Sequence, residues 1–150
     1  MSHTMTKAER EAFLAEPRVA ILALSDKGRG PLAVPIWYIY EPGGELWFLT
    51  AKASPKGRLL KPEKRISLCV QTETRPYKYV SVEGPITRIG TATTDDHLLP
   101  MAQRYRGEAD GRSYAESLRE ALASGSRMLV HMAPERWLTL DYAKAGESGQ

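Results

Sequence analysis

The basic segment Thr50–Arg58, TAKASPKGR, has residue types that suit the binding of an anion. It places three basic side chains within nine residues and contains no acid. Ser54 is a favoured N-cap residue, and Pro55 is a favoured first residue of a helix. Free backbone N–H groups at a helix start carry partial positive charge, to which Lys56 and Arg58 add full charges. The pattern is typical of phosphate sites built at the start of a helix.

Two further side chains of the basic segment extend this interpretation. The hydroxyl of Thr50 can donate a hydrogen bond to the same anion, as can that of Ser54, and Lys52 adds a third charge. The alternative is a solvated basic loop with an ordinary helix cap. The residues of the segment leave both interpretations open.

Aromatic side chains gather on the segments around the basic segment. They are Trp37, Tyr38, Tyr40, Trp47, Phe48, Tyr77, Tyr79 and Trp137. Large aromatic residues mostly fill cores, but such a cluster also suits a flat ring system. Pro35 precedes the first of them and lacks an N–H group, so we expect an edge strand or a bulge there. Backbone groups exposed in this way can form hydrogen bonds with the rim of a heterocycle.

The sequence gives only weak indications of a metal site or of catalytic side chains. His3, His97 and His131 lie far apart, and no group of His, Cys or carboxylate residues has metal-ligand spacing, so no metal is expected. We expect His97 and His131 to be structural or solvated. No phosphate-binding P-loop, GxSxG motif or Cys/His nucleophile pattern occurs, and the sequence offers no evident general base.

The composition indicates one globular domain. The chain has 150 residues, of which 42% are hydrophobic and 26% charged. No apolar run approaches the roughly 20 residues of a membrane span, and the first residues lack a secretory signal. Cys69 is the single cysteine of the chain, so no internal disulfide can form. We therefore expect a cytoplasmic protein that does not bind membranes, with a net charge of +3 that suits a small anionic ligand.

Pattern and turn residues predict the order of the elements. Thr6 and Glu9 form a capping box for a helix that ends before Pro17. Seven strands are expected, over residues 18–25, 32–40, 45–50, 65–72, 77–89, 127–132 and 136–142, the fifth of them broken near Gly84-Pro85. Residues 93–123 predict two helices with a hinge at 107–112. Residues 1–142 thus form one domain, and 143–150 are expected to be a flexible tail.

Short turns between most of these strands imply antiparallel pairing. Regularly spaced strands joined by hairpin turns favour a barrel. The fold class is therefore mainly β, with an N-terminal helix and a helical insert before the last strands.

The order of several blocks resembles the pyridoxamine 5′-phosphate oxidase-like, flavin-binding split-barrel superfamily. The blocks are FLAEPRVAILAL, VPIWYIY, LWFLTAKASPKGRLL, RISLCVQ, YKYVSVEGP and PERWLTLDY, which leave out the helical insert and the tail. More narrowly, the chain resembles the actinobacterial branch whose members use the deazaflavin F420. The resemblance implies a six-stranded antiparallel split barrel that forms a homodimer, with the cofactor at the interface.

The resemblance also implies which residues bind the cofactor. They are Val34, Pro35, Ile36, Trp37, Thr50, Ala51, Lys52, Ser54, Lys56, Arg58, Tyr79 and Trp137. Val34–Tyr38 matches the strand beside the ring, and the basic segment matches the phosphate block, except that Pro55 replaces an arginine. Tyr79 falls where the phosphate oxidases have a glutamine near the ring. Trp137 matches an aromatic residue that comes from the partner subunit.

The leading functional hypothesis is an F420-dependent oxidoreductase that moves a hydride to or from an unsaturated small molecule. Lys52, Arg58 and Lys61 are candidates to meet the acidic glutamate tail of F420. Such an enzyme needs little acid–base machinery, because the cofactor supplies the chemistry. The alternatives are an FMN-dependent oxidase or reductase, a non-enzymatic flavin or F420 carrier, and a haem-binding split barrel. Nucleic-acid binding is disfavoured, since the basic residues form no extended stripe.

Overall fold

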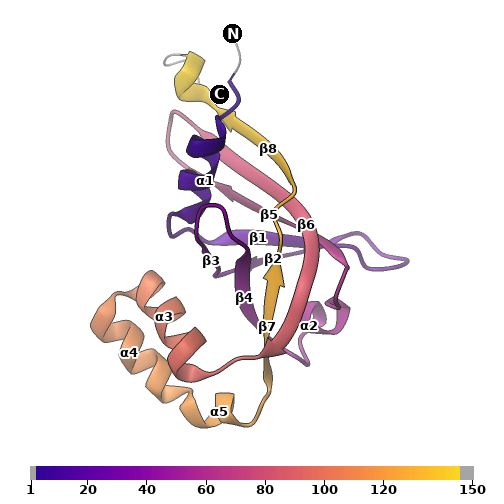
Figure 1. Ribbon diagram of the computed structural model, residues 1–150, viewed down its shortest axis with the longest axis vertical. Coiled ribbons are helices and arrows are strands. Elements are labelled where there is room, and N and C mark those ends of the chain that lie inside the picture. Colours follow the sequence, from indigo (N-terminus) through magenta and orange to yellow (C-terminus); the bar gives the residue numbers. More distant parts are fainter. Residues whose placement is uncertain (1–2, 146–150) are drawn as a thin grey trace.

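The computed structural model describes residues 3–145 of the chain (Figure 1). The strands are β1 (Ala20–Leu24), β2 (Leu32–Ile36), β3 (Ile39–Tyr40), β4 (Leu46–Ala51), β5 (Arg65–Gln71), β6 (Lys78–Thr91), β7 (Arg127–Met132) and β8 (Arg136–Asp141). The helices are α1 (Lys7–Ala15), α2 (Pro55–Leu59), α3 (Leu99–Arg106), α4 (Glu108–Ser117) and α5 (Arg119–Ala123), with a π-helical turn at Thr94–Leu98 and a 3-10 helix at Tyr142–Ala145. None of these helices combines the length and apolar character that crossing a membrane requires.

The strands form one strongly curled antiparallel sheet. Their order is β2-β1-β5-β6-β7-β4-β3, and β8 pairs with β6. The long strand β6 belongs to both halves, because its first part pairs with β5 and β8 and its last part pairs with β7. This arrangement confirms the mainly β split barrel.

The strand count differs from the six that the resemblance implied. The described residues contain eight strands, because the expected strand over residues 32–40 is divided into β2 and β3 at Trp37-Tyr38. β2 ends one side of the sheet, so the prediction of an edge at Pro35 is confirmed. The division also leaves the backbone of Trp37 and Tyr38 outside the strand ladder.

The break predicted near Gly84-Pro85 does not occur, since β6 continues from Lys78 to Thr91. The strand instead shifts register with β7 between Ile86 and Arg88. Gly84 lies against the chain between β7 and β8, where an added Cβ would stand 1.7 Å from the carbonyl oxygen of Ala133. The glycine therefore permits close backbone contact rather than ending the strand.

Cross-strand pairing divides the half-barrel around β1, β5, β6 and β8 into two faces. One row across the sheet consists of Val34, Leu22, Leu68, Val82 and Trp137, and faces the core. The next row consists of Pro35, Ile21, Cys69, Ser81 and Leu138, and we call it the outer row. Ile21 and Leu138 of the outer row are 43% and 62% exposed.

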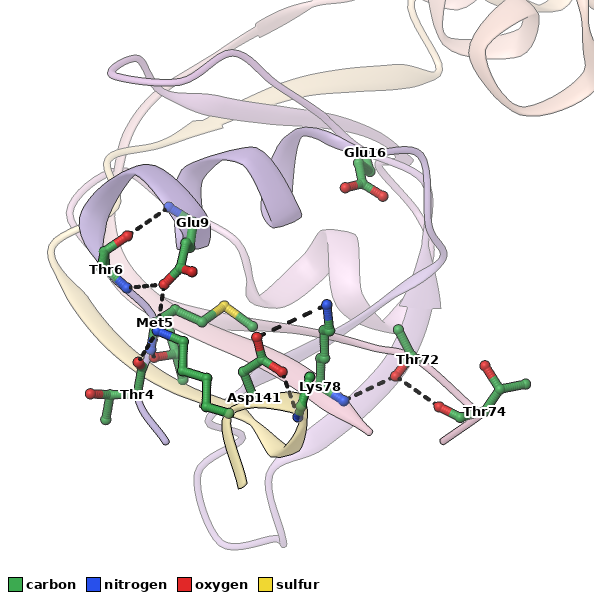
Figure 2. Close-up of polar contacts among 12 residues, drawn as sticks. Thr4, Met5, Thr6, Glu9, Glu16, Thr72, Thr74, Lys78 and Asp141 are labelled. Atoms are coloured by element: carbon green, nitrogen blue, oxygen red, sulfur yellow. Dashed lines mark hydrogen bonds and ion pairs between the residues drawn. The ribbon is translucent and has the colours of Figure 1, made fainter. Parts of the chain in front are cut away.

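The N-terminal and C-terminal segments of the described chain contact each other through hydrogen bonds and an ion pair (Figure 2). Thr6 and Glu9 form the predicted capping box of α1, and the backbone N–H of Met5 donates to the Thr139 hydroxyl over 3.0 Å. The ammonium of Lys144 contacts the Glu9 carboxylate at 2.6 Å. Of the expected tail, residues 143–145 therefore belong to a short 3-10 helix, and residues 146–150 lie outside the described residues.

The helical insert (residues 94–123) differs from the two helices expected. It contains a π-helical turn and three α-helices, and the expected hinge at 107–112 is reduced to Gly107, with φ of 86°. Gly111 is helical and lets α4 cross α3 closely, since a Cβ there would stand 2.5 Å from the Gln103 nitrogen. The insert has a small apolar cluster of its own, formed by Leu98, Ala115 and Leu122. Figure 1 shows it projecting to one side of the barrel.

Candidate functional site

A pocket of about 190 Å³ lies where the barrel meets the helical insert. Its lining residues are Pro35, Ile36, Trp37, Leu49, Lys56, Leu98, Met101, Tyr114 and Arg127. They come from β2 and the residue after it, β4, α2, the insert and β7. The sequence predicted four of them, namely Pro35, Ile36, Trp37 and Lys56. The pocket thus combines an edge strand, an apolar wall and two cations.

Helix α2 places Lys56 at the pocket. As predicted, Ser54 is its N-cap, and the Ser54 hydroxyl accepts a hydrogen bond from the Gly57 N–H over 3.0 Å. The turn packs closely on the end of β4, because a Cβ at Gly57 would stand 2.2 Å from the carbonyl oxygen of Ala51. A glycine at this position therefore sets how closely α2, and with it Lys56, approaches the sheet.

The hydroxyl groups of the basic segment are largely used within the protein. Ser54 Oγ donates to the carbonyl oxygen of Ala51 over 2.8 Å and lies 3.3 Å from Thr50 Oγ1. Thr50 is only 2% exposed. These bonds hold the segment in shape, and of its side chains the charged ones are left to meet an anion.

Two cations of the pocket and three others in or just after the basic segment have no carboxylate partner among the described residues. Among the described residues, no acid forms an ion pair with Lys52, Lys56, Arg58, Lys61 or Arg127. Elsewhere arginines are well paired: Arg65 contacts Glu83 and Glu135, and Arg119 contacts Asp95 and Glu116. A group of unpaired cations beside a pocket favours an anionic ligand.

Arg127 is a pocket residue that the sequence did not reveal. It begins β7, directly opposite Ala51 at the end of β4, so strand pairing brings it to the basic segment. Local sequence gave no signal for this, because 75 residues separate Arg127 from Lys52. Leu98, Met101 and Tyr114 were missed for the same reason, since they come from the insert.

The aromatic part of the pocket is ordered by ring stacking. The ring of Trp37 is stacked on that of Tyr105 in α3, with centroids 4.9 Å apart and planes within 3°. The ring of Tyr114 in α4 also meets Trp37, edge-on, with centroids 6.1 Å apart. The insert therefore fixes the orientation of Trp37.

The remaining predicted residues are distributed unevenly. Thr50, Ala51 and Ser54 adjoin the pocket through the basic segment, and Lys52 and Arg58 are exposed on it. Val34 and Trp137 belong to the core row, where Trp137 contacts Tyr40 and Arg10.

Tyr79 lies on the face that carries the outer row, beside Gln71 of β5 and Leu140 of β8. The structure does not bring Val34, Tyr79 or Trp137 to the pocket of the same chain. Their cofactor roles stay predictions.

The histidines have structural surroundings. His97 Nδ1 accepts a hydrogen bond from the Thr93 N–H over 2.9 Å, and its ring packs edge-on against Trp47. His131 lies between Arg88 and Glu45, and its partial burial lowers its pKa. Within residues 3–145, no cluster of His, Cys, Asp or Glu could hold a metal ion.

Comparisons with known proteins agree with this architecture. The sequence profile of the pyridoxamine 5′-phosphate oxidase family matches residues 6–141. The chain therefore belongs to that family, whose members are flavin-type oxidoreductases. No curated protein sequence matches the chain.

Three solved structures illustrate the shared fold. A conserved hypothetical protein from Mycobacterium tuberculosis is 22% identical with a TM-score of 0.75, covering 97% of this chain and 91% of its own. An F420 reductase is 21% identical with a TM-score of 0.65, covering 85% and 94%. An FAD and heme binding protein from Mycobacterium smegmatis is 22% identical with a TM-score of 0.64, covering 92% and 71%. At these identities the likeness establishes the fold.

Proposed function

We propose that the protein is an F420-dependent oxidoreductase that transfers a hydride to or from an unsaturated small molecule. The observation that carries the proposal is the pocket in which Pro35–Trp37 meets Lys56 and Arg127. The bound deazaflavin would supply the redox chemistry, and the protein would orient it and exclude water. The membership of the chain in a family of flavin-type oxidoreductases supports this assignment.

The residues of the pocket fit a flat ring that carries an anionic side chain. β2 is an edge strand, so the backbone groups that point away from β1 have no strand partner within residues 3–145. Such groups can bond to the carbonyl and N–H groups on the rim of a deazaflavin. Lys56 and Arg127 provide charge for the phosphate, and the exposed Lys52, Arg58 and Lys61 provide charge for the glutamate tail.

The size of the pocket supports a site that is completed by a second copy of the chain. Pockets for small molecules usually measure about 300–1,000 Å³, whereas this one has about 190 Å³. Among the described residues, three large hydrophobic side chains are exposed, namely those of Val19, Ile21 and Leu138. Two of them belong to the outer row, which ends at Pro35 on the rim of the pocket. We therefore place the second copy on this face of the barrel.

The variant Leu138→Asp should convert the proposed homodimer into a monomer. Leu138 is 62% exposed in the single chain, so the substitution should change the stability of the monomer little. In the dimer the same substitution would bury a charge. Light scattering at micromolar concentration measures the change. Thr87→Asp is the control, because Thr87 is exposed on the last part of β6, beyond the residues that pair with β8. If wild type is a monomer that binds cofactor with full affinity, the interface site is wrong.

The cofactor preference tests F420 against the FMN alternative. The family resemblance places Pro55 where an arginine would hold the FMN phosphate with two hydrogen bonds. We therefore expect tighter binding of F420 than of FMN, measured by calorimetric titration of the wild type. An FMN affinity at least tenfold higher, which corresponds to about 1.4 kcal/mol, would favour the FMN-dependent enzyme instead. Binding of F420 without turnover of any unsaturated acceptor would favour the carrier alternative.

A further inference from the structure

We propose that Tyr105 is a positioning residue that holds Trp37 in the pocket and thereby sets the affinity of the site for the cofactor ring. The proposal rests on the proposed function, in that it concerns the same pocket. Tyr105 lies on α3, outside the sequence blocks that carry the family resemblance. It does not line the pocket itself, so any effect on binding would pass through Trp37.

The hydroxyl of Tyr105 takes the place of strand pairing at the gap between β2 and β3. It accepts a hydrogen bond from the backbone N–H of Tyr38 over 3.2 Å. Its oxygen also lies 2.7 Å from the carbonyl oxygen of Arg18 and 3.1 Å from that of Tyr38. The single hydroxyl hydrogen can go to either carbonyl. One side chain of the insert therefore satisfies backbone groups that the interrupted ladder leaves free.

The two residues of the gap point in opposite directions and are held in different ways. Tyr38 is fully buried, and its hydroxyl donates to the carbonyl oxygen of Leu14 over 2.6 Å. Burial raises the pKa of Tyr38, so this phenol stays protonated and acts as a hydrogen-bond donor. Trp37 points toward the insert, where its ring lies flat on that of Tyr105.

A second contact fixes α3 to the barrel beside this gap. The neighbouring Arg104 donates to the carbonyl oxygen of Ala15, at the end of α1, over 2.8 Å. Its guanidinium also lies 5.5 Å from the Tyr38 ring and 5.6 Å from the Tyr105 ring. These contacts leave Tyr105 little freedom, so the stacked ring of Trp37 is held in place before any ligand binds. Such preorganisation raises affinity, because the ring does not have to be ordered on binding.

Two variants separate the hydroxyl from the stacked ring. Tyr105→Phe keeps the ring and removes the hydrogen bonds, whereas Tyr105→Leu removes both. We expect Tyr105→Phe to weaken F420 binding by up to about tenfold, the limit reached if the whole free energy of one hydrogen bond is lost from the positioning of Trp37, and Tyr105→Leu to weaken it further. Tyr142→Phe is the control, because no hydrogen bond from its hydroxyl is found within residues 3–145.

Nuclear magnetic resonance provides a readout that does not depend on the cofactor. In Tyr105→Phe the Tyr38 amide should exchange at least about threefold faster, as for the loss of one hydrogen bond, while the amides of β5 keep their rates. In Tyr105→Leu the indole N–H signal of Trp37 should shift. The inference is overturned if Tyr105→Leu leaves both the Trp37 signal and the F420 affinity as in wild type, or if all core amides exchange faster together. If wild type binds neither F420 nor FMN, the proposed function fails and the effect on affinity fails with it, but the Trp37 signal still decides whether Tyr105 positions this ring.

Discussion

Replacement of both Lys56 and Arg127 by alanine should weaken F420 binding by about a hundredfold or more. A hydrogen bond to a charged group contributes about 1.5–3 kcal/mol, and about 1.4 kcal/mol corresponds to a factor of ten. Lys56→Ala alone should therefore cost about tenfold or more. The stability should change little, because neither side chain forms an ion pair within the described residues. Calorimetric titration measures the affinities, and chemical denaturation measures the stability.

Two controls show whether the loss of affinity comes from the charge at the pocket. Lys7→Ala removes an exposed lysine from α1 and should leave both affinity and stability unchanged. Added salt should weaken wild-type binding more than binding by the double variant, since screening acts on the charges that the variant lacks. If the double variant binds F420 as tightly as the wild type does, the basic segment is only a solvated loop and the site lies elsewhere.

The variant Gly84→Ala should lower the free energy of unfolding by about 3 kcal/mol or more, at the upper end of the usual cost of overpacking. The new methyl group would stand 1.7 Å from the carbonyl oxygen of Ala133, and that contact is with backbone. The N–H of Ala133 bonds to the carbonyl oxygen of Pro85 over 3.1 Å, so the segment is not free to move aside. Urea denaturation gives the difference between wild type and variant.

Gly90→Ala is a matched control for Gly84→Ala. It makes the same substitution in the same strand, at an exposed position where an added Cβ meets no atom within 4 Å. Its effect should stay within about 0.5 kcal/mol, as for most surface substitutions. If both variants lose the same free energy of unfolding, close packing of Gly84 against the β7–β8 connection is not the cause of the loss.

The parts of this fold that depend on residues close together in the sequence could be predicted from it. The Thr6–Glu9 capping box and the Ser54-Pro55 helix start both form as expected, because a cap is built from residues a few positions apart. The hairpin between β1 and β2 pairs antiparallel, as a short turn requires. Pro35 lies on an edge strand because it has no N–H to give to a second neighbour.

The pocket depended on long-range contacts that the sequence does not display. Arg127 reaches the basic segment only because β7 pairs with β4, and the apolar wall arises because the insert folds back on the barrel. Strand geometry also decides which residues of the run Val34–Trp37 reach the pocket. Val34 faces the core, opposite to Pro35, and unlike Ile36 it does not stand at the end of β2. Only Pro35, Ile36 and Trp37 of that run line the pocket.

A crystal structure of the protein in complex with F420 tests the central claim most directly. The account predicts a deazaflavin ring beside Pro35–Trp37, the phosphate at Lys56 and Arg127, and a second copy of the chain closing the site across the outer row. A cofactor bound elsewhere, for example in the hollow lined by Thr93, Asp95 and Arg119, would contradict it.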